Sequence, residues 1–345
     1  MTAEADVSTE QIRRAMTPQI EFGRRLLVEA SSHWGSYVVL TMPEPWEVAR
    51  GMVSQTPKHV HFLESMDRAV TETAERLLPP ADTIVGIGGG MALDMAKYVA
   101  WQRDTEPVLV PSIASVDACV TNTIAVRDAG KVRYIGFVVP RVVLADFDLM
   151  QSAPAHLNRA GIGDILSIHT ALWDWKAAAE RGCGAFDPVV AEQVAALVNE
   201  LEAHCGGIRN TTEESLRWLI EAYAAENALC LGVGHSRPEE GSEHFFAYNV
   251  EHRTGRGFVH GELVCLGVLL LSRLQENHPE RVQSILTSSA VRYQPRDLGL
   301  SRSEIEQALA TLLEYVEAER LPYSVINERP PDTAQIEATC SDLRF

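Results

Sequence analysis

The sequence predicts an α/β domain built on a parallel sheet, followed by an all-helical domain. Over residues 1–152, short apolar runs of β type alternate with helical patterns. From residue 153 onward nearly every segment has helical periodicity. The length of 345 residues is comfortable for two domains. We therefore predict one domain over residues 1–152 and a second over residues 153–345.

The predicted strands of the first domain are short runs rich in Val, Ile and Leu. They cover residues 37–41, 59–63, 83–87, 108–110, 134–139 and 142–145. Helical patterns lie between them at residues 46–54, 66–78 and from about residue 92. Such apolar strands, alternating with helices, indicate a parallel sheet that is covered on both faces.

The predicted helices of the second domain cover residues 164–179, 188–204, 212–231, 260–276 and 302–318. A cleft between a sheet domain and a helical domain is the expected place for a small-molecule substrate.

Charge and composition exclude several partners. The formal net charge is −17 and the isoelectric point is about 5.1, which argues against nucleic acid or an anionic membrane surface as a partner. Residues 1–16 are polar, and no stretch approaches the roughly 20 apolar residues that span a bilayer. The six cysteines are scattered, as in a reducing compartment. We therefore expect a cytoplasmic protein.

A glycine turn follows the strand predicted at residues 83–87. Gly88, Gly89 and Gly90 allow the backbone to bend sharply, and a helix begins there whose free N–H groups suit a pyrophosphate. A simple tight turn is an equal alternative, since the spacing is not G-x-G-x-x-G. Asp94 and Lys97 lie one helical turn apart, so they either pair with each other or face a ligand.

One carboxylate and two histidines form a candidate metal site. Asp164 follows two glycines at the start of a predicted helix, where a carboxylate also serves as a cap. His244 and His260 each lie at or near the start of another helix. Each residue alone is more often structural. Together, one carboxylate and two imidazoles leave a fourth position open, as catalytic zinc or ferrous sites do.

These motifs resemble the superfamily of iron-containing alcohol dehydrogenases, glycerol dehydrogenases and dehydroquinate synthase. Within it the chain is most similar to the sn-glycerol-1-phosphate dehydrogenases. The stretches that carry the resemblance lie at residues 38–51, 86–97, 110–117, 161–167, 174–175, 236–244 and 259–262.

The resemblance implies a dehydroquinate synthase-like fold, with a Rossmann-like N-terminal domain and an all-α C-terminal domain. It implies NAD or NADP and a metal, Zn²⁺ or alternatively Fe²⁺, held by Asp164, His244 and His260. The positions that match cofactor contacts are Gly88, Gly89, Gly90, Met91, Ala92, Leu93, Asp94, Ser112, Ile113, Ala114, Ser115 and Thr121. Asp117 matches a substrate contact. The implied reaction is the reversible reduction of dihydroxyacetone phosphate to sn-glycerol 1-phosphate, in a homo-oligomer.

The chain departs from the family on the substrate side. Tyr248 stands where the family has a further histidine in contact with the substrate, and Val116 also replaces a histidine. We expect Tyr248, with Asp117 and Asp164, to take part in catalysis. His252 matches no ligand and is expected to be a solvated histidine. No acidic residue ends the strand at residues 37–41, so NADP is as acceptable as NAD.

An alternative is a lyase of the dehydroquinate synthase or cyclitol synthase type, in which NAD is regenerated within each turnover. The carboxylate Asp164 and the scarcity of lysine near the motifs argue against it.

Overall fold

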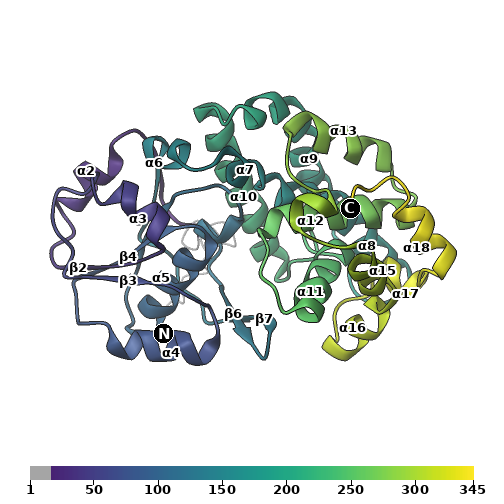
Figure 1. The fold of residues 1–345 in the computed structure, drawn as a ribbon, viewed down its shortest axis with the longest axis horizontal. Coiled ribbons are helices and arrows are strands. Elements are labelled where there is room, and N and C mark those ends of the chain that lie inside the picture. Colours follow the sequence, from purple (N-terminus) through teal and green to yellow (C-terminus); the bar gives the residue numbers. More distant parts are fainter. Residues whose placement is uncertain (1–16) are drawn as a thin grey trace, which may run out of the picture.

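The computed structural model describes residues 17–345, so the polar segment 1–16 lies outside the described residues. The first half of the chain contains a parallel sheet (Figure 1). The order of its strands is β1-β8-β5-β4-β2-β3. The strands of this sheet are β1 (Ile20–Gly23), β2 (Tyr37–Thr41), β3 (His59–Phe62), β4 (Thr83–Gly88), β5 (Val108–Pro111) and β8 (Val142–Asp146).

Side chains alternate between the two faces of the sheet, and both faces are buried. Val38 and Leu40 belong to one apolar core, while Tyr37 and Val39 belong to another. The helices of this half are α2 (Leu26–Ser31), α3 (Pro43–Ala49), α4 (Arg68–Leu77), α5 (Gly90–Gln102) and α6 (Phe147–Ser152). The parallel sheet with both faces covered confirms the predicted α/β class.

The prediction of a strand of the parallel sheet at residues 134–139 is wrong. The chain instead forms an antiparallel hairpin of β6 (Ile124–Asp128) and β7 (Lys131–Ile135), separate from the parallel sheet. A turn with positive φ at Ala129 and Gly130 reverses the chain, so β7 pairs with its sequence neighbour. Strand β1 was not predicted, because a four-residue edge strand with only partly buried side chains has a weak hydrophobic pattern.

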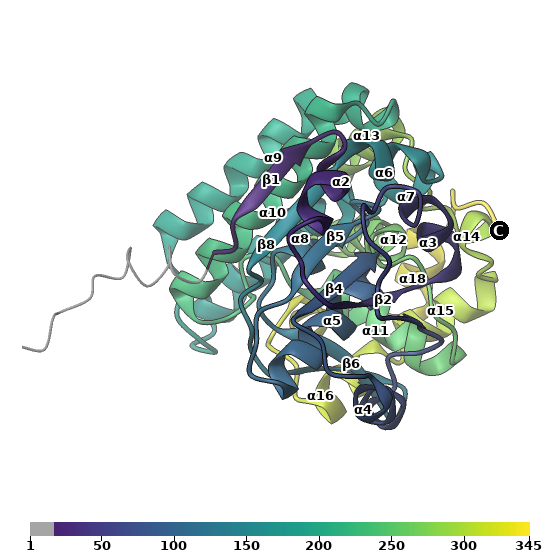
Figure 2. The same cartoon turned by 90° about the vertical axis from the view of Figure 1, so that its left-hand side faces the viewer.

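The second half is helical and lies beside the sheet, which faces the viewer in Figure 2. Its longer helices are α8 (Ile162–Glu180), α9 (Pro188–Arg209), α10 (Glu213–Val233), α11 (Ser242–Thr254), α12 (His260–Gln275), α13 (Pro279–Ser289), α15 (Arg302–Ala310) and α16 (Leu312–Glu319). Shorter helices are α7 (Ala155–Arg159), α14 (Pro295–Leu298), α17 (Val325–Glu328) and α18 (Thr333–Thr339). The single helix predicted at residues 302–318 is two helices that meet at Thr311.

Helix α12 lies at the centre of the helical half. Its residues from Gly261 to Ser272 are all buried, because α8, α11 and α13 pack around it. An apolar helix buried all round is the expected centre of such a bundle. Within residues 17–345, no helix combines the length and the apolar character needed to cross a bilayer.

Candidate active site

Three helices meet at glycines, and this contact positions the candidate metal ligands. A Cβ on Gly163 of α8 would lie 2.5 Å from Cα of Gly261 in α12. A Cβ on Gly267 of α12 would lie 2.7 Å from the carbonyl oxygen of Glu243 in α11. Any larger side chain at these crossings would push the helices apart. Asp164, His260 and His244 are chain neighbours of these contacts, so the close approach brings them together.

Asp164, His244 and His260, hereafter the trio, offer ligand atoms that all lie within 4.8 Å of one another. Oδ1 of Asp164 lies 3.3 Å from Nε2 of His260, yet it is buried and has no hydrogen-bond partner among residues 17–345. Oδ2 of Asp164 accepts the backbone N–H of Asp117 at 3.1 Å. The carboxylate therefore does not cap its own helix. A buried oxygen without a partner, facing two imidazoles, fits a divalent cation.

Glu243 orients the ring of His244. Its carboxylate lies 2.9 Å from Nδ1 of His244 and also accepts the Thr170 hydroxyl at 2.7 Å and the Gly241 N–H at 2.6 Å. Nε2 of His244 is thereby left for a metal, as in other metal-binding histidines. Burial opposes a charge on this ring, but the hydrogen bond and charge of Glu243 outweigh burial and raise the pKa of His244 to about 9.

Most of the predicted cofactor residues lie at the carboxyl ends of β4 and β5, whereas Asp94 lies within α5 and Thr121 follows the 3₁₀ turn Asp117–Cys119. Gly88 pairs with Pro111 across these strands, and the Ser112 N–H donates to the Gly88 carbonyl at 2.9 Å. At Gly88, φ is +154° and a Cβ would meet the Cβ of Ala92 at 2.7 Å, so the turn requires glycine. No side chain in the described part of the chain caps the start of α5. Its first N–H groups are therefore available to a phosphate.

Asp94 and Lys97 form a buried ion pair, with 2.8 Å between Oδ1 and Nζ. Lys97 is fully buried and also donates to the carbonyl oxygens of Thr121 and Thr123, at 3.1 and 2.7 Å. The lysine therefore holds the segment after the 3₁₀ turn Asp117–Cys119 against α5. Its ammonium group is already satisfied by these partners.

A cavity of about 450 Å³ opens beside the trio and contains Asp117 and Tyr248 in its wall. Burial and the nearby charge of Asp164 raise the pKa of Asp117 to about 7. The Tyr248 hydroxyl donates to Oε1 of Glu240 at 2.9 Å and lies 3.2 Å from the Tyr134 hydroxyl. Burial raises the pKa of Tyr248 well above its usual value, so the hydroxyl stays protonated.

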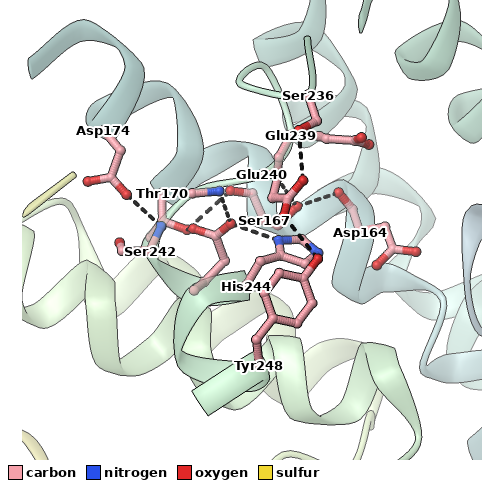
Figure 3. Close-up of polar contacts among 12 residues, drawn as sticks. Asp164, Ser167, Thr170, Asp174, Ser236, Glu239, Glu240, Ser242, His244 and Tyr248 are labelled. Atoms are coloured by element: carbon pink, nitrogen blue, oxygen red, sulfur yellow. Dashed lines mark hydrogen bonds and ion pairs between the residues drawn. The ribbon is translucent and has the colours of Figure 1, made fainter. Parts of the chain in front are cut away.

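Sequence reasoning did not single out several residues of this wall, among them the polar residues Tyr134, Ser236, Glu239 and Glu240. The adjacent pair Glu239-Glu240, just before the Gly-Ser-Glu-His stretch, was the available signal. His252 is exposed, and its ring lies near the ring of Tyr315. It is not a member of the trio. Ser236 donates to Oε2 of Glu240 at 2.7 Å, so Glu240 is held at both oxygens (Figure 3).

Comparison with known proteins agrees with this architecture. Residues 46–154 match the family model described as iron-containing alcohol dehydrogenase. Among solved structures, a probable glycerol dehydrogenase from Sinorhizobium meliloti 1021 superimposes with a TM-score of 0.70 at 19% identity, covering 94% of this chain and 96% of that chain. An iron-containing alcohol dehydrogenase from Corynebacterium glutamicum gives 0.69 at 17% identity, covering 99% and 97%. These neighbours share the fold.

Curated relatives are more similar in sequence. A glycerol-1-phosphate dehydrogenase [NAD(P)+] of Hyperthermus butylicus is 29% identical over 315 residues, which is 88% of this chain and 88% of the relative. One from Saccharolobus islandicus (strain Y.G.57.14) is 30% identical over 292 residues, or 82% of each chain. The chain therefore belongs to the iron-containing alcohol dehydrogenase family, and within it to the group of glycerol-1-phosphate dehydrogenases.

Proposed function

We propose that the chain interconverts a small ketone and the corresponding alcohol, with NAD or NADP as the redox partner and a divalent metal at the trio. One observation carries the proposal: the buried, unpartnered Oδ1 of Asp164 meets two imidazoles at the wall of a cavity. The proposed ligands are Asp164, His244 and His260. A divalent ion held there would act as a Lewis acid on the carbonyl oxygen of the substrate.

The chain's own residues would bind and orient the remaining groups. The predicted cofactor residues, from Gly88 to Asp94, from Ser112 to Ser115 and at Thr121, would hold the dinucleotide, with its pyrophosphate at the start of α5. Tyr248 has a protonated hydroxyl in the cavity beside the trio, so it is suited to donate a hydrogen bond to the substrate, and Glu240 and Tyr134 would position it. Asp117 would contact the substrate.

The names of the relatives make dihydroxyacetone phosphate and sn-glycerol 1-phosphate the first substrate pair to test, with related polyols and their phosphates beside it. Zinc is the proposed metal and ferrous ion the alternative, because one carboxylate and two imidazoles suit both. We also propose a cytoplasmic homo-oligomer.

The test measures the absorbance of reduced nicotinamide with each ketone, with NADH and NADPH in turn and with added zinc. Net consumption of the reduced cofactor is expected. A lyase that regenerates NAD within each turnover would show none, and that result would replace the proposed reaction.

Metal analysis tests the trio independently of activity. His260→Ala should lose the bound metal, whereas His252→Ala, a substitution at an exposed histidine, should keep it. Equal metal loss in the two variants would refute the assignment of His260.

A further inference from the structure

A second group of possible metal ligands lies at the cavity wall, apart from the trio. One carboxylate oxygen of Glu226, Sγ of Cys230 and one carboxylate oxygen of Glu239 all lie within 4.8 Å of one another. We name these three residues the Glu-Cys-Glu group. The group shares no residue with the trio. Three donor atoms this close together can surround one metal ion.

The backbone holds the three donors in place. Glu226 and Cys230 lie four residues apart in α10, so their side chains project from the same face of the helix. Glu239 lies in the turn between α10 and α11, where its N–H donates to the Ser236 carbonyl at 3.0 Å and its carbonyl accepts the Ser167 hydroxyl at 2.7 Å. Two ligands one helical turn apart, with a third from another segment, are a common arrangement in metal sites.

The carboxylate of Glu226 is buried without a partner. Its residue is 1% exposed, and neither carboxylate oxygen has a hydrogen-bond partner among residues 17–345. A carboxylate in this position has lost its hydration and has gained no interaction in return. An ion at the trio would not supply the missing contact, because Glu226 is not among the ligands of that ion. Glu226 therefore needs a partner of its own.

The sulfur atom favours a metal ion over an organic cation as this partner. An ammonium group requires hydrogen-bond acceptors, and a thiol sulfur is a weak acceptor. A thiolate is instead a preferred ligand of zinc, which also accepts carboxylates. Burial and the charges of Asp117 and Glu240 raise the pKa of the free Cys230 thiol to about 13, so a metal ion must displace this proton as it binds.

The cavity gives such an ion an open coordination position. Cys230 and Glu239 line the cavity, whereas Glu226 does not. Three protein ligands leave the fourth tetrahedral position of zinc open, and on this wall it would face the cavity. Among the lining residues of the described chain there is no lysine or arginine. An ion at this place would therefore be a positive group that an oxygen of the substrate can reach.

We propose that Glu226, Cys230 and Glu239 bind a second divalent metal ion, Zn²⁺ before others, with an open position toward the substrate cavity. The site is separate from the trio, and its occupancy can be measured without cofactor, substrate or turnover.

Metal analysis of the full chain after equilibration with zinc tests the number of ions. The wild-type protein should hold two zinc ions per chain. Glu226→Gln should hold one, at the trio, and His260→Ala should hold one, at the Glu-Cys-Glu group. The double variant should hold none. Glu221→Gln, at an exposed position on the same helix α10, is the matched control and should hold two.

Cobalt in place of zinc identifies the sulfur ligand. A thiolate bound to Co²⁺ gives an intense charge-transfer band in the near ultraviolet, which carboxylate and imidazole ligands do not give. Within residues 17–345, Cys230 is the one cysteine that belongs to a group of three possible metal ligands. The band should appear in the wild-type protein and in His260→Ala, and it should be absent in Cys230→Ser.

Two results would overturn the proposal. A single zinc ion in the wild-type protein, with no thiolate band, would mean that protons rather than a metal neutralise Glu226 and Glu239. Two zinc ions with a band that persists in Cys230→Ser would place the second ion at another cysteine. Both results leave the trio as the first metal site, because loss of one ion in His260→Ala tests that site separately.

Discussion

Substitution of Gly163 by alanine is expected to separate α8 from α12 and disrupt the trio. The added Cβ would lie 2.5 Å from Cα and 2.6 Å from the carbonyl oxygen of Gly261. Carbon atoms pack at about 3.5–4.0 Å, so the helices must move apart by roughly 1 Å. Asp164 and His260 adjoin these two glycines, and metal–ligand distances tolerate only about 0.2 Å of change.

The expected loss of metal affinity is about 100-fold or more, because a shift of this size removes one ligand from reach. Overpacking should also cost about 1–3 kcal/mol of stability. The assay is zinc titration with a competing chelator, combined with denaturant unfolding of the metal-free protein.

Gly206→Ala is the matched control, because this glycine lies inside α9 and a Cβ there meets nothing within 4 Å. It should keep full metal affinity and gain up to about 1 kcal/mol from better helix propensity. Wild-type zinc affinity in Gly163→Ala would refute the argument that the glycine crossing positions the ligands.

Three further predictions follow from the buried charges. Glu243→Gln should weaken zinc binding by about 10–100-fold in the chelator assay, because the amide NH₂ group of glutamine cannot accept the hydrogen bonds that the Glu243 carboxylate accepts from Thr170, Gly241 and His244. Unchanged zinc affinity would show that Glu243 does not orient His244. The pKa of His244 is raised to about 9, so below that pH a proton must leave the ring before zinc can bind. Zinc affinity should therefore fall about tenfold when the pH is lowered from 8 to 7. A zinc affinity that is the same at both pH values would contradict this prediction. Lys97→Met should cost about 3–5 kcal/mol in urea unfolding, because Asp94 would stay buried without its partner; a loss below about 1 kcal/mol would contradict the buried pair.

The local pattern of the chain was sufficient for much of the fold. The apolar strands at residues 37–41 and 83–87 and the long helices from Pro188 and His260 were predicted correctly, because burial on both faces or all round leaves continuous apolar runs. The hairpin of β6 and β7 was mispredicted, since an apolar run does not say which strand it will pair with. Edge strand β1 was missed because half-exposed side chains give little pattern.

For the site, the sequence by itself determined which residue types were present and that each candidate ligand begins a helix. A family resemblance selected Asp164, His244 and His260 from the other candidates. Only the tertiary structure decided that the three come within 4.8 Å, because that distance depends on the contacts of Gly163 with Gly261 and of Gly267 with Glu243, which join separate helices. The tertiary structure also brought Glu226 to Glu239, since local periodicity carries no information on such long-range contacts.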